Sequence, residues 1–76
     1  MRIKDRIRAV MVDQGLDPAG LAPKLGVTAN TIYRYLKGSL YPSADVLIRL
    51  CDLGGFDLAD ILAQLTKERQ AARHKP

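Results

Sequence analysis

The sequence predicts a small all-α domain of five helices, and three observations support this fold class. Apolar residues recur three and four positions apart through most of the chain, as they do on the buried face of a helix. These stretches begin after good N-capping residues and end near glycine or proline. No part of the chain is predicted to be a strand. With 76 residues, the chain has room for one domain with a modest core.

The first helix is predicted over Arg2 to Gln14, and Gly15 ends it. Its apolar residues lie on one stripe and form its expected buried face: Ile3, Ile7, Val10 and Met11. The basic residues of this segment lie on the other sides of the helix, where a run of charges is usually a solvated face.

The second predicted helix is short and ends in a sharp turn. Asp17 is a good N-cap, Pro18 fits the first helical position, and Gly26 adopts at low cost the left-handed conformation that ends a helix. Pro23 removes a backbone hydrogen bond, at a cost of about 3 kcal/mol in a helix interior, so we expect a short or distorted helix. We interpret Gly20 as permitting a close approach of helices.

The third predicted helix follows the N-cap Thr28 and runs from Ala29 to about Lys37. Its apolar residues follow the i, i+3, i+4 rule and predict a packed side: Ile32, Tyr35 and Leu36. The opposite side carries hydrogen-bonding and basic side chains: Ala29, Asn30, Tyr33, Arg34 and Lys37. After it, residues 39–42 form a loop in which we expect Tyr41 to be exposed.

Two further helices complete the predicted fold. Ser43 caps the fourth, which ends at the Gly54-Gly55 pair and supplies four core residues: Val46, Leu47, Leu50 and Cys51. Asp57 caps the fifth, with Asp60 completing an approximate capping box. Its apolar stripe consists of Leu58, Ile61, Leu62 and Leu65.

We place the domain at residues 1–66 and a basic C-terminal extension at residues 67–76. Within the extension, Glu68 to Ala72 are expected to continue the helix, and His74 to Pro76 to be frayed. The net charge of +4 is uneven, because basic residues concentrate at both ends of the chain and in the second and third helices. Residues 39–66 instead carry four aspartates against Arg49. This distribution predicts one basic side facing a polyanion and an acidic far side.

Two short helices joined by a glycine turn, the second packed on one side and polar on the other, suit the major groove of DNA. The stretch LAPKLGVTANTIYRYLKG, followed by Pro42-Ser43, resembles the helix-turn-helix of the Cro and phage-repressor family, the XRE type. The resemblance extends over roughly Ile3 to Leu62. It implies a five-helix, lambda-repressor-like DNA-binding domain with the helix-turn-helix at helices 2 and 3. The size of the chain and its charged last helix resemble those of small phage or prophage regulators.

The chain departs from the family pattern at three positions. Pro18 stands where the family usually places a phosphate-contacting glutamine, so that contact is not expected. Met11 and Leu36 stand where phage repressors often bury an arginine and a glutamate. Because apolar residues replace both partners of an ion pair with little loss of stability, we predict a Met11–Leu36 contact.

Four residues of the third helix are the predicted base readers. Arg34 suits guanine O6 and N7, and Asn30 suits adenine N6 and N7. Ala29 offers a methyl group to thymine, and Tyr33 suits thymine or a phosphate. Tyr35 has a competing interpretation as a base stacker, but its position favours the core. Residues bordering the groove are predicted to contact phosphates: Thr28, Lys37, Ser39 and Tyr41. One of the basic residues Arg2, Lys4 and Arg6 is also expected to contact a phosphate, and Arg6 is the residue predicted.

An enzyme is not predicted. His74 is the single histidine and Cys51 the single cysteine, and they lie far apart in the sequence, so neither a Cys–His pair nor a metal cluster is expected. No catalytic residue, metal site, cofactor or small-molecule ligand is predicted. Cys51 is interpreted as a buried filler in a reducing cytoplasm, with a reactive thiol as the alternative. No apolar run suggests a membrane span, and a cytoplasmic, nucleoid-associated location is expected.

The sequence therefore predicts a transcriptional regulator, a repressor that binds a pseudo-palindromic operator as a homodimer. The stripe of the fifth helix, with Phe56 and the tail, is the candidate dimer interface, although an intramolecular core is the favoured interpretation of the stripe itself. One alternative is an antitoxin-like or adaptor protein whose main partner is another protein. Another is a non-specific binder of nucleic acid that uses the two basic ends of the chain.

Overall fold

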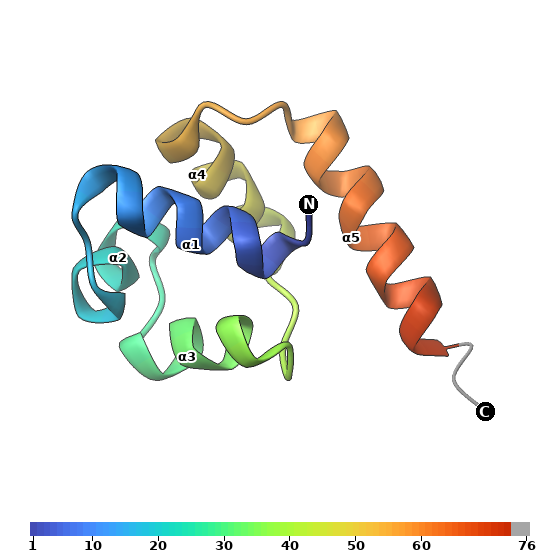
Figure 1. Cartoon of the computed structure of the whole chain (residues 1–76), viewed down its shortest axis with the longest axis horizontal. Coiled ribbons are helices and arrows are strands. Elements are labelled where there is room, and N and C mark those ends of the chain that lie inside the picture. Colours follow the sequence, from blue (N-terminus) through green and yellow to red (C-terminus); the bar gives the residue numbers. More distant parts are fainter. Residues whose placement is uncertain (74–76) are drawn as a thin grey trace.

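The protein is described by a computed structural model that covers residues 1–73 and contains five helices (Figure 1). These are α1 (Ile3–Gln14), α2 (Pro18–Leu25), α3 (Ala29–Lys37), α4 (Ala44–Gly54) and α5 (Leu58–Arg73). No strand occurs within residues 1–73. The all-α fold class with five helices is confirmed, and the frayed end predicted for His74 to Pro76 lies outside the described residues.

Helices α1 and α4 are central to the packing, because α1 contacts α3, α4 and α5 and α4 contacts α1, α2 and α5. Helix α2 packs on α3 and α4. In Figure 1, α3 lies below α1, and α5 descends on the side opposite α2. The pair α2 and α3 has the most extensive contact of all helix pairs in the fold. The helix-turn-helix is therefore a packed unit that is attached to the rest of the domain mainly through α1 and α4.

Three of the four predicted caps are present at the starts of their helices, and the Asp57 cap of the last helix stays a prediction. The Asp17 carboxylate accepts a hydrogen bond from the Gly20 N–H at 2.7 Å, and the Thr28 hydroxyl accepts one from the Thr31 N–H at 3.2 Å. The Ser43 hydroxyl does the same for Val46 at 3.5 Å. Each of these bonds satisfies a donor that lacks a partner within its own helix. The first helix begins one residue later than predicted, at Ile3.

Pro23 lies inside α2, and the helix nevertheless runs on to Leu25. The expectation of a short helix is confirmed, since α2 has eight residues. The interpretation of Gly20 was wrong. A Cβ at this position would meet the Asp17 carboxylate at 3.2 Å and a Leu16 methyl at 3.3 Å, and no side chain of another helix is among its nearest neighbours. Gly20 is therefore crowded by the loop that caps its own helix.

All five helices contribute to the core, whose buried residues are Ile3, Ile7, Val10, Leu21, Ala22, Leu25, Ile32, Tyr35, Val46, Leu47, Leu50, Cys51 and Ile61. This confirms the core predicted for α4 and the core interpretation of Tyr35. Burial raises the pKa of the Cys51 thiol, with smaller contributions from the Asp52 and Asp57 carboxylates, so the thiol stays protonated near neutral pH. Met11 and Leu36 both pack against this core, and their direct contact stays a prediction.

Helix α5 differs from the buried stripe that its sequence suggests. Ile61 is fully buried and Leu65 is half-buried, but the side chains of Leu58 and Leu62 are 37% and 42% exposed. The helix also continues without a break past Thr66, where the sequence suggested that the compact domain ends. The expected helical continuation of the basic extension is thus present.

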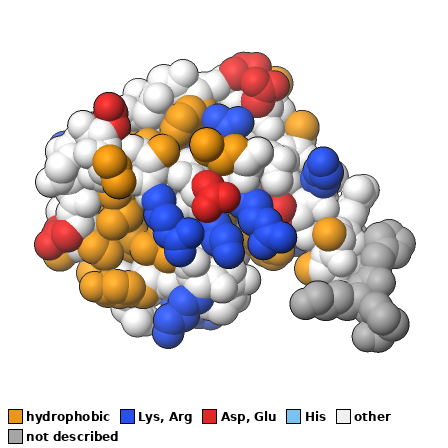
Figure 2. Space-filling model, viewed as in Figure 1, with side chains coloured by type: hydrophobic (Ala, Val, Ile, Leu, Met, Phe, Trp, Pro, Cys, Tyr) orange, Lys and Arg blue, Asp and Glu red, His pale blue; other side chains and the backbone are white. Residues whose placement is uncertain are grey.

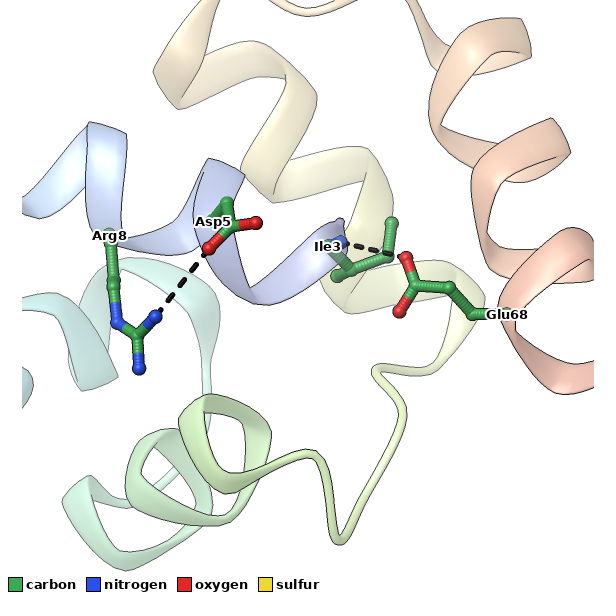
Figure 3. A network of polar contacts seen from close by, with 4 residues as sticks. All are labelled: Ile3, Asp5, Arg8 and Glu68. Atoms are coloured by element: carbon green, nitrogen blue, oxygen red, sulfur yellow. Dashed lines mark hydrogen bonds and ion pairs between the residues drawn. The ribbon is translucent and has the colours of Figure 1, made fainter. Parts of the chain in front are cut away.

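Glu68 attaches the far end of α5 to the start of α1. Its carboxylate Oε2 accepts a hydrogen bond from the Ile3 N–H at 2.9 Å (Figure 3). The same oxygen accepts one from Gln64 Nε2, also at 2.9 Å. A carboxylate at a helix N-terminus is favourable because it pairs with free N–H groups and with the positive end of the helix dipole. The same view shows the exposed Asp5–Arg8 ion pair at 3.5 Å, which contributes little to stability.

Candidate nucleic-acid interface

Helix α3 presents its polar side to solvent. Ile32 and Tyr35 are 0% and 5% exposed on the packed side, which turns the other side of the helix outward. The outward residues include four that were predicted to face DNA: Asn30, Tyr33, Arg34 and Lys37. Tyr33 is 53% exposed although it is a large aromatic residue. Ala29 is half-buried at the start of the helix. The structure thus brings three of the four predicted base readers to one exposed face: Asn30, Tyr33 and Arg34.

Both ends of α3 carry hydroxyl groups that already have local partners. The Thr28 hydroxyl caps the helix and lies 3.0 Å from the Thr31 hydroxyl. At the other end, the Ser39 hydroxyl donates to the Arg34 carbonyl oxygen at 3.2 Å. Both Thr28 and Ser39 are exposed, so each hydroxyl is held in a fixed position beside the outward face of α3. Fixed polar groups of this kind suit contacts that set register on a phosphate backbone.

Basic residues from two helices meet at the C-terminal end of α3. Arg2, Lys4 and Lys37 line one cavity of about 360 Å³, which lies between the start of α1, the end of α3 and the end of α5. The Glu68 carboxylate lies in the same lining and partly offsets their charge. In Figure 2, Lys and Arg side chains form a band across the middle of the face, between α1 and α3, and hydrophobic side chains gather on the left. The positive charge is therefore concentrated beside the outward face of α3.

Two predicted phosphate contacts are not placed as expected. The Arg6 guanidinium lies over the ring of Phe56, 5.0 Å from its centroid, and its Nε is buried without a hydrogen-bond partner. This cation–π contact engages Arg6 with the α4–α5 connection. Tyr41 was expected to be exposed, but it is half-buried and its hydroxyl donates to the Glu68 carbonyl oxygen at 3.5 Å. Both side chains are thus engaged in contacts within the domain.

Arg49 is a residue of this region that sequence reasoning missed. Its Nη1 donates to the Leu25 carbonyl oxygen at 3.2 Å, which places a guanidinium from α4 at the turn between α2 and α3. In that turn Gly26 has a φ of 72°, and the Val27 N–H donates to the Ala22 carbonyl oxygen at 3.0 Å. Local sequence carries no signal for the Arg49 contact, because the partners are 24 residues apart.

Within residues 1–73, no group of three or more His, Cys, Asp or Glu side chains is placed to hold a metal ion. No helix in this part of the chain is long and apolar enough to cross a membrane.

A short helix packed against its partner across a glycine turn, with amide, phenol and guanidinium groups facing outward, defines a DNA-binding helix-turn-helix domain. The chain belongs to the helix-turn-helix family, whose pattern it matches over residues 5–65. The resemblance to XRE-type proteins is thereby confirmed.

A protein of Haemophilus influenzae (strain ATCC 51907 / DSM 11121 / KW20 / Rd), named an uncharacterized HTH-type transcriptional regulator, is 32% identical to this chain over 66 residues. The matched region is 87% of this chain and 28% of that protein, so the chain spans less than a third of its relative's length. No solved structure matches this chain.

Proposed function

We propose that this chain is a transcriptional regulator that reads a specific double-stranded DNA sequence by placing α3 in the major groove. The observation that carries the proposal is the outward face of α3, where Asn30, Tyr33 and Arg34 are exposed while Ile32 and Tyr35 are buried. The family match and the name of the H. influenzae relative support the same class of function. Repression follows from occupancy alone, because a bound protein blocks access to the DNA beneath it.

Each outward residue has a proposed role. Arg34 donates two parallel hydrogen bonds to a guanine, and Asn30 bridges the N6 and N7 atoms of an adenine. Tyr33 contacts a thymine methyl group or a phosphate, and Ala29 contacts a thymine methyl group. Phosphate contacts are proposed for the residues that flank this face: Thr28, Lys37 and Ser39.

We further propose that two copies bind a pseudo-palindromic operator through a two-fold dimer. One helix-turn-helix buries little surface on DNA, and a symmetric pair places its recognition helices about 34 Å apart, one turn of the duplex. The exposed Leu58 and Leu62 side chains on α5 support this arrangement, because they offer an apolar surface that a second copy can bury. A small phage or prophage origin also stays a proposal.

The test is a binding selection from randomised duplex DNA at fixed, near-physiological salt, because phosphate contacts alone change affinity strongly with salt. Wild type is expected to enrich an inverted repeat, and Arg34→Ala to lose the preference at one symmetric position by about 1 to 3 kcal/mol. Arg69→Ala removes the same charge from exposed α5 and serves as the matched control. It should weaken all sequences alike. Enrichment of no sequence by wild type would refute specific readout by α3.

A second candidate function is binding to another protein, as an antitoxin-like or adaptor protein. The observation that favours it is Val12, which is 83% exposed and borders a mainly apolar hollow with Met11 and Leu16. A Val12→Ser variant separates the two functions. Operator binding should be unchanged in this variant if the regulator proposal holds, whereas loss of a stable complex with a co-expressed protein would support the alternative.

Non-specific binding through the two basic ends of the chain is tested by replacing charged side chains. Truncation is unsuitable because it would remove Glu68, which holds α5 to α1. Replacing Lys67 and Arg69 by Gln removes two exposed charges and keeps that contact. In the regulator proposal this variant loses affinity for every duplex equally and keeps its sequence preference. Loss of nearly all DNA binding would favour the non-specific alternative.

A further inference from the structure

We propose that Arg49 of α4 is a positioning residue for DNA binding, because its guanidinium holds the turn between α2 and α3 and thereby sets the orientation of α3. The effect of Arg49 on DNA binding rests on the proposed function, whereas the contact between Arg49 and the turn does not. Arg49 Nη1 donates to the Leu25 carbonyl oxygen at 3.2 Å. Leu25 is the last residue of α2, and α3 begins four residues later, at Ala29.

The Leu25 carbonyl needs a partner from outside its helix. The last carbonyls of any α-helix lack intrahelical donors. In α2 the turn satisfies two of them, since the Gly26 N–H donates to Pro23 and the Val27 N–H donates to Ala22. Arg49 provides the donor for Leu25. A guanidinium at this position also interacts favourably with the negative end of the α2 dipole.

Gly26 and Arg49 are fitted to each other. A Cβ at Gly26 would overlap Nη1 of Arg49 and lie 3.2 Å from its Cζ, so the guanidinium occupies the space that any other residue would need. The left-handed φ of 72° is a separate reason for glycine there. Gly15 has nearly the same conformation, with a φ of 63°, yet nothing lies within 4 Å of its Cβ position. At the Cβ position, the two glycines therefore differ in the presence of Arg49.

The contact joins the turn to a well-anchored helix. Leu47 and Leu50, on either side of Arg49 in the sequence, are fully buried, which holds α4 in the core. Helix α3 packs mainly on α2 and α1. A hydrogen bond from α4 to the end of α2 therefore restricts movement of the helix-turn-helix as a unit. Base contacts need such fixed geometry, whereas non-specific phosphate contacts tolerate small changes in angle.

The first experiment compares wild type, Arg49→Met and Arg49→Lys in their affinity for the selected operator and for a random duplex. All are measured at one salt concentration and at a temperature where circular dichroism shows folded protein. Arg49→Met should lower the ratio of specific to non-specific affinity about tenfold, the loss expected for one charged hydrogen bond. Arg49→Lys, which retains a donor, should restore most of that ratio.

Two results would overturn the proposal. One is an unchanged affinity ratio with an unchanged salt slope in folded Arg49→Met, which would leave Arg49 a role in stability alone. The other is an unchanged ratio accompanied by a salt slope smaller by about one, which would make Arg49 a direct phosphate contact. Measuring the slope over several salt concentrations separates these results from the expected one.

The second experiment tests the contact without DNA. Asparagine tolerates the left-handed conformation better than most residues, so Gly26→Asn and Gly15→Asn form a matched pair. Gly26→Asn should have the lower midpoint of thermal unfolding of the two. The difference between the two variants should disappear when each substitution is made separately in an Arg49→Ala background. A difference that persists in that background would refute the fitted pair.

Amide hydrogen exchange distinguishes failure of the proposed DNA-binding function from failure of the proposed role of Arg49. Arg49→Met should speed hydrogen exchange of the Val27 N–H, which lies in the turn, about tenfold. Exchange of the Leu47 N–H, which donates to the Ser43 carbonyl oxygen in the first turn of α4, should be unchanged. If wild type selects no DNA sequence but this exchange result is obtained, the proposed function fails and the Arg49 contact stands. Unchanged exchange at Val27 would show that Arg49 does not hold the turn.

Discussion

Helices α3 and α5 are both amphipathic, yet they leave different surfaces free. Helix α3 has nine residues, buries Ile32 and Tyr35 almost completely, and exposes amide, phenol and charged groups. Helix α5 has 16 residues, buries Ile61 completely, and exposes much of Leu58 and Leu62. A polar outer face suits a hydrated groove with hydrogen-bonding edges, whereas an apolar outer face suits another apolar surface. The comparison shows two exposed surfaces of different chemistry, one polar on α3 and one at Leu58 and Leu62 on α5.

The largest expected effect contrasts a core residue with an exposed one. Ile32→Ala should lower the free energy of unfolding by about 2 to 5 kcal/mol, because it removes buried methyl groups and leaves a cavity beneath α3. Leu62→Ala, at 42% exposure, should cost less than about 1 kcal/mol in dilute protein. Urea unfolding followed by circular dichroism measures both. Equal losses would mean that α5 is as tightly packed as α3.

The next prediction concerns the apolar face of α5. Replacing Leu58 and Leu62 by Ser should weaken self-association by about 3 kcal/mol per dimer, since both leucines retain apolar surface that a partner would bury. Sedimentation equilibrium with and without operator DNA measures the effect. Ile48→Ser, at a residue of α4 that is 46% exposed, serves as the control. If the control weakens association equally, the interface is not specific to α5.

A smaller effect is expected at the cap of the recognition helix. Thr28→Ala removes the acceptor for the Thr31 N–H and should cost about 1 kcal/mol of stability, whereas Thr28→Ser keeps the hydroxyl and should cost much less. Thermal unfolding distinguishes the two variants. A large loss for Thr28→Ser as well would assign the effect to the threonine methyl group rather than to the cap.

The smallest effect is a decline of stability in alkali. Burial raises the pKa of both the Tyr35 phenol and the Cys51 thiol. A group whose pKa is higher in the folded state contributes stability that is complete below its unfolded pKa and is lost as the pH rises through the folded value. Stability should therefore fall above about pH 8.5, where an unfolded thiol ionises, and fall further near pH 10 for tyrosine. Cys51→Ala should remove the first part of this decline, and Tyr35→Phe the second.

The sequence by itself determined the helices and the outward face of α3. Each cap bond joins residues three positions apart, so Asp17, Thr28 and Ser43 indicate the starts of their helices from local sequence alone. The side of α3 that carries Asn30 and Arg34 follows from helical periodicity, because Ile32 and Tyr35 fall on the opposite side. These features need no knowledge of which helices meet.

Only the tertiary structure decided the contacts between distant segments. Glu68 bonds to Ile3 across 65 positions, Tyr41 reaches Glu68 across 27, and Arg49 reaches Leu25 across 24. Long polar side chains have many accessible rotamers, and each direction is chosen by the surfaces that packing brings near. Arg6 illustrates this point, because its sequence context suggested a phosphate while packing placed it over an aromatic ring. The exposure of α5 was decided in the same way, since periodicity shows that a stripe is apolar but not how much of it the other helices cover.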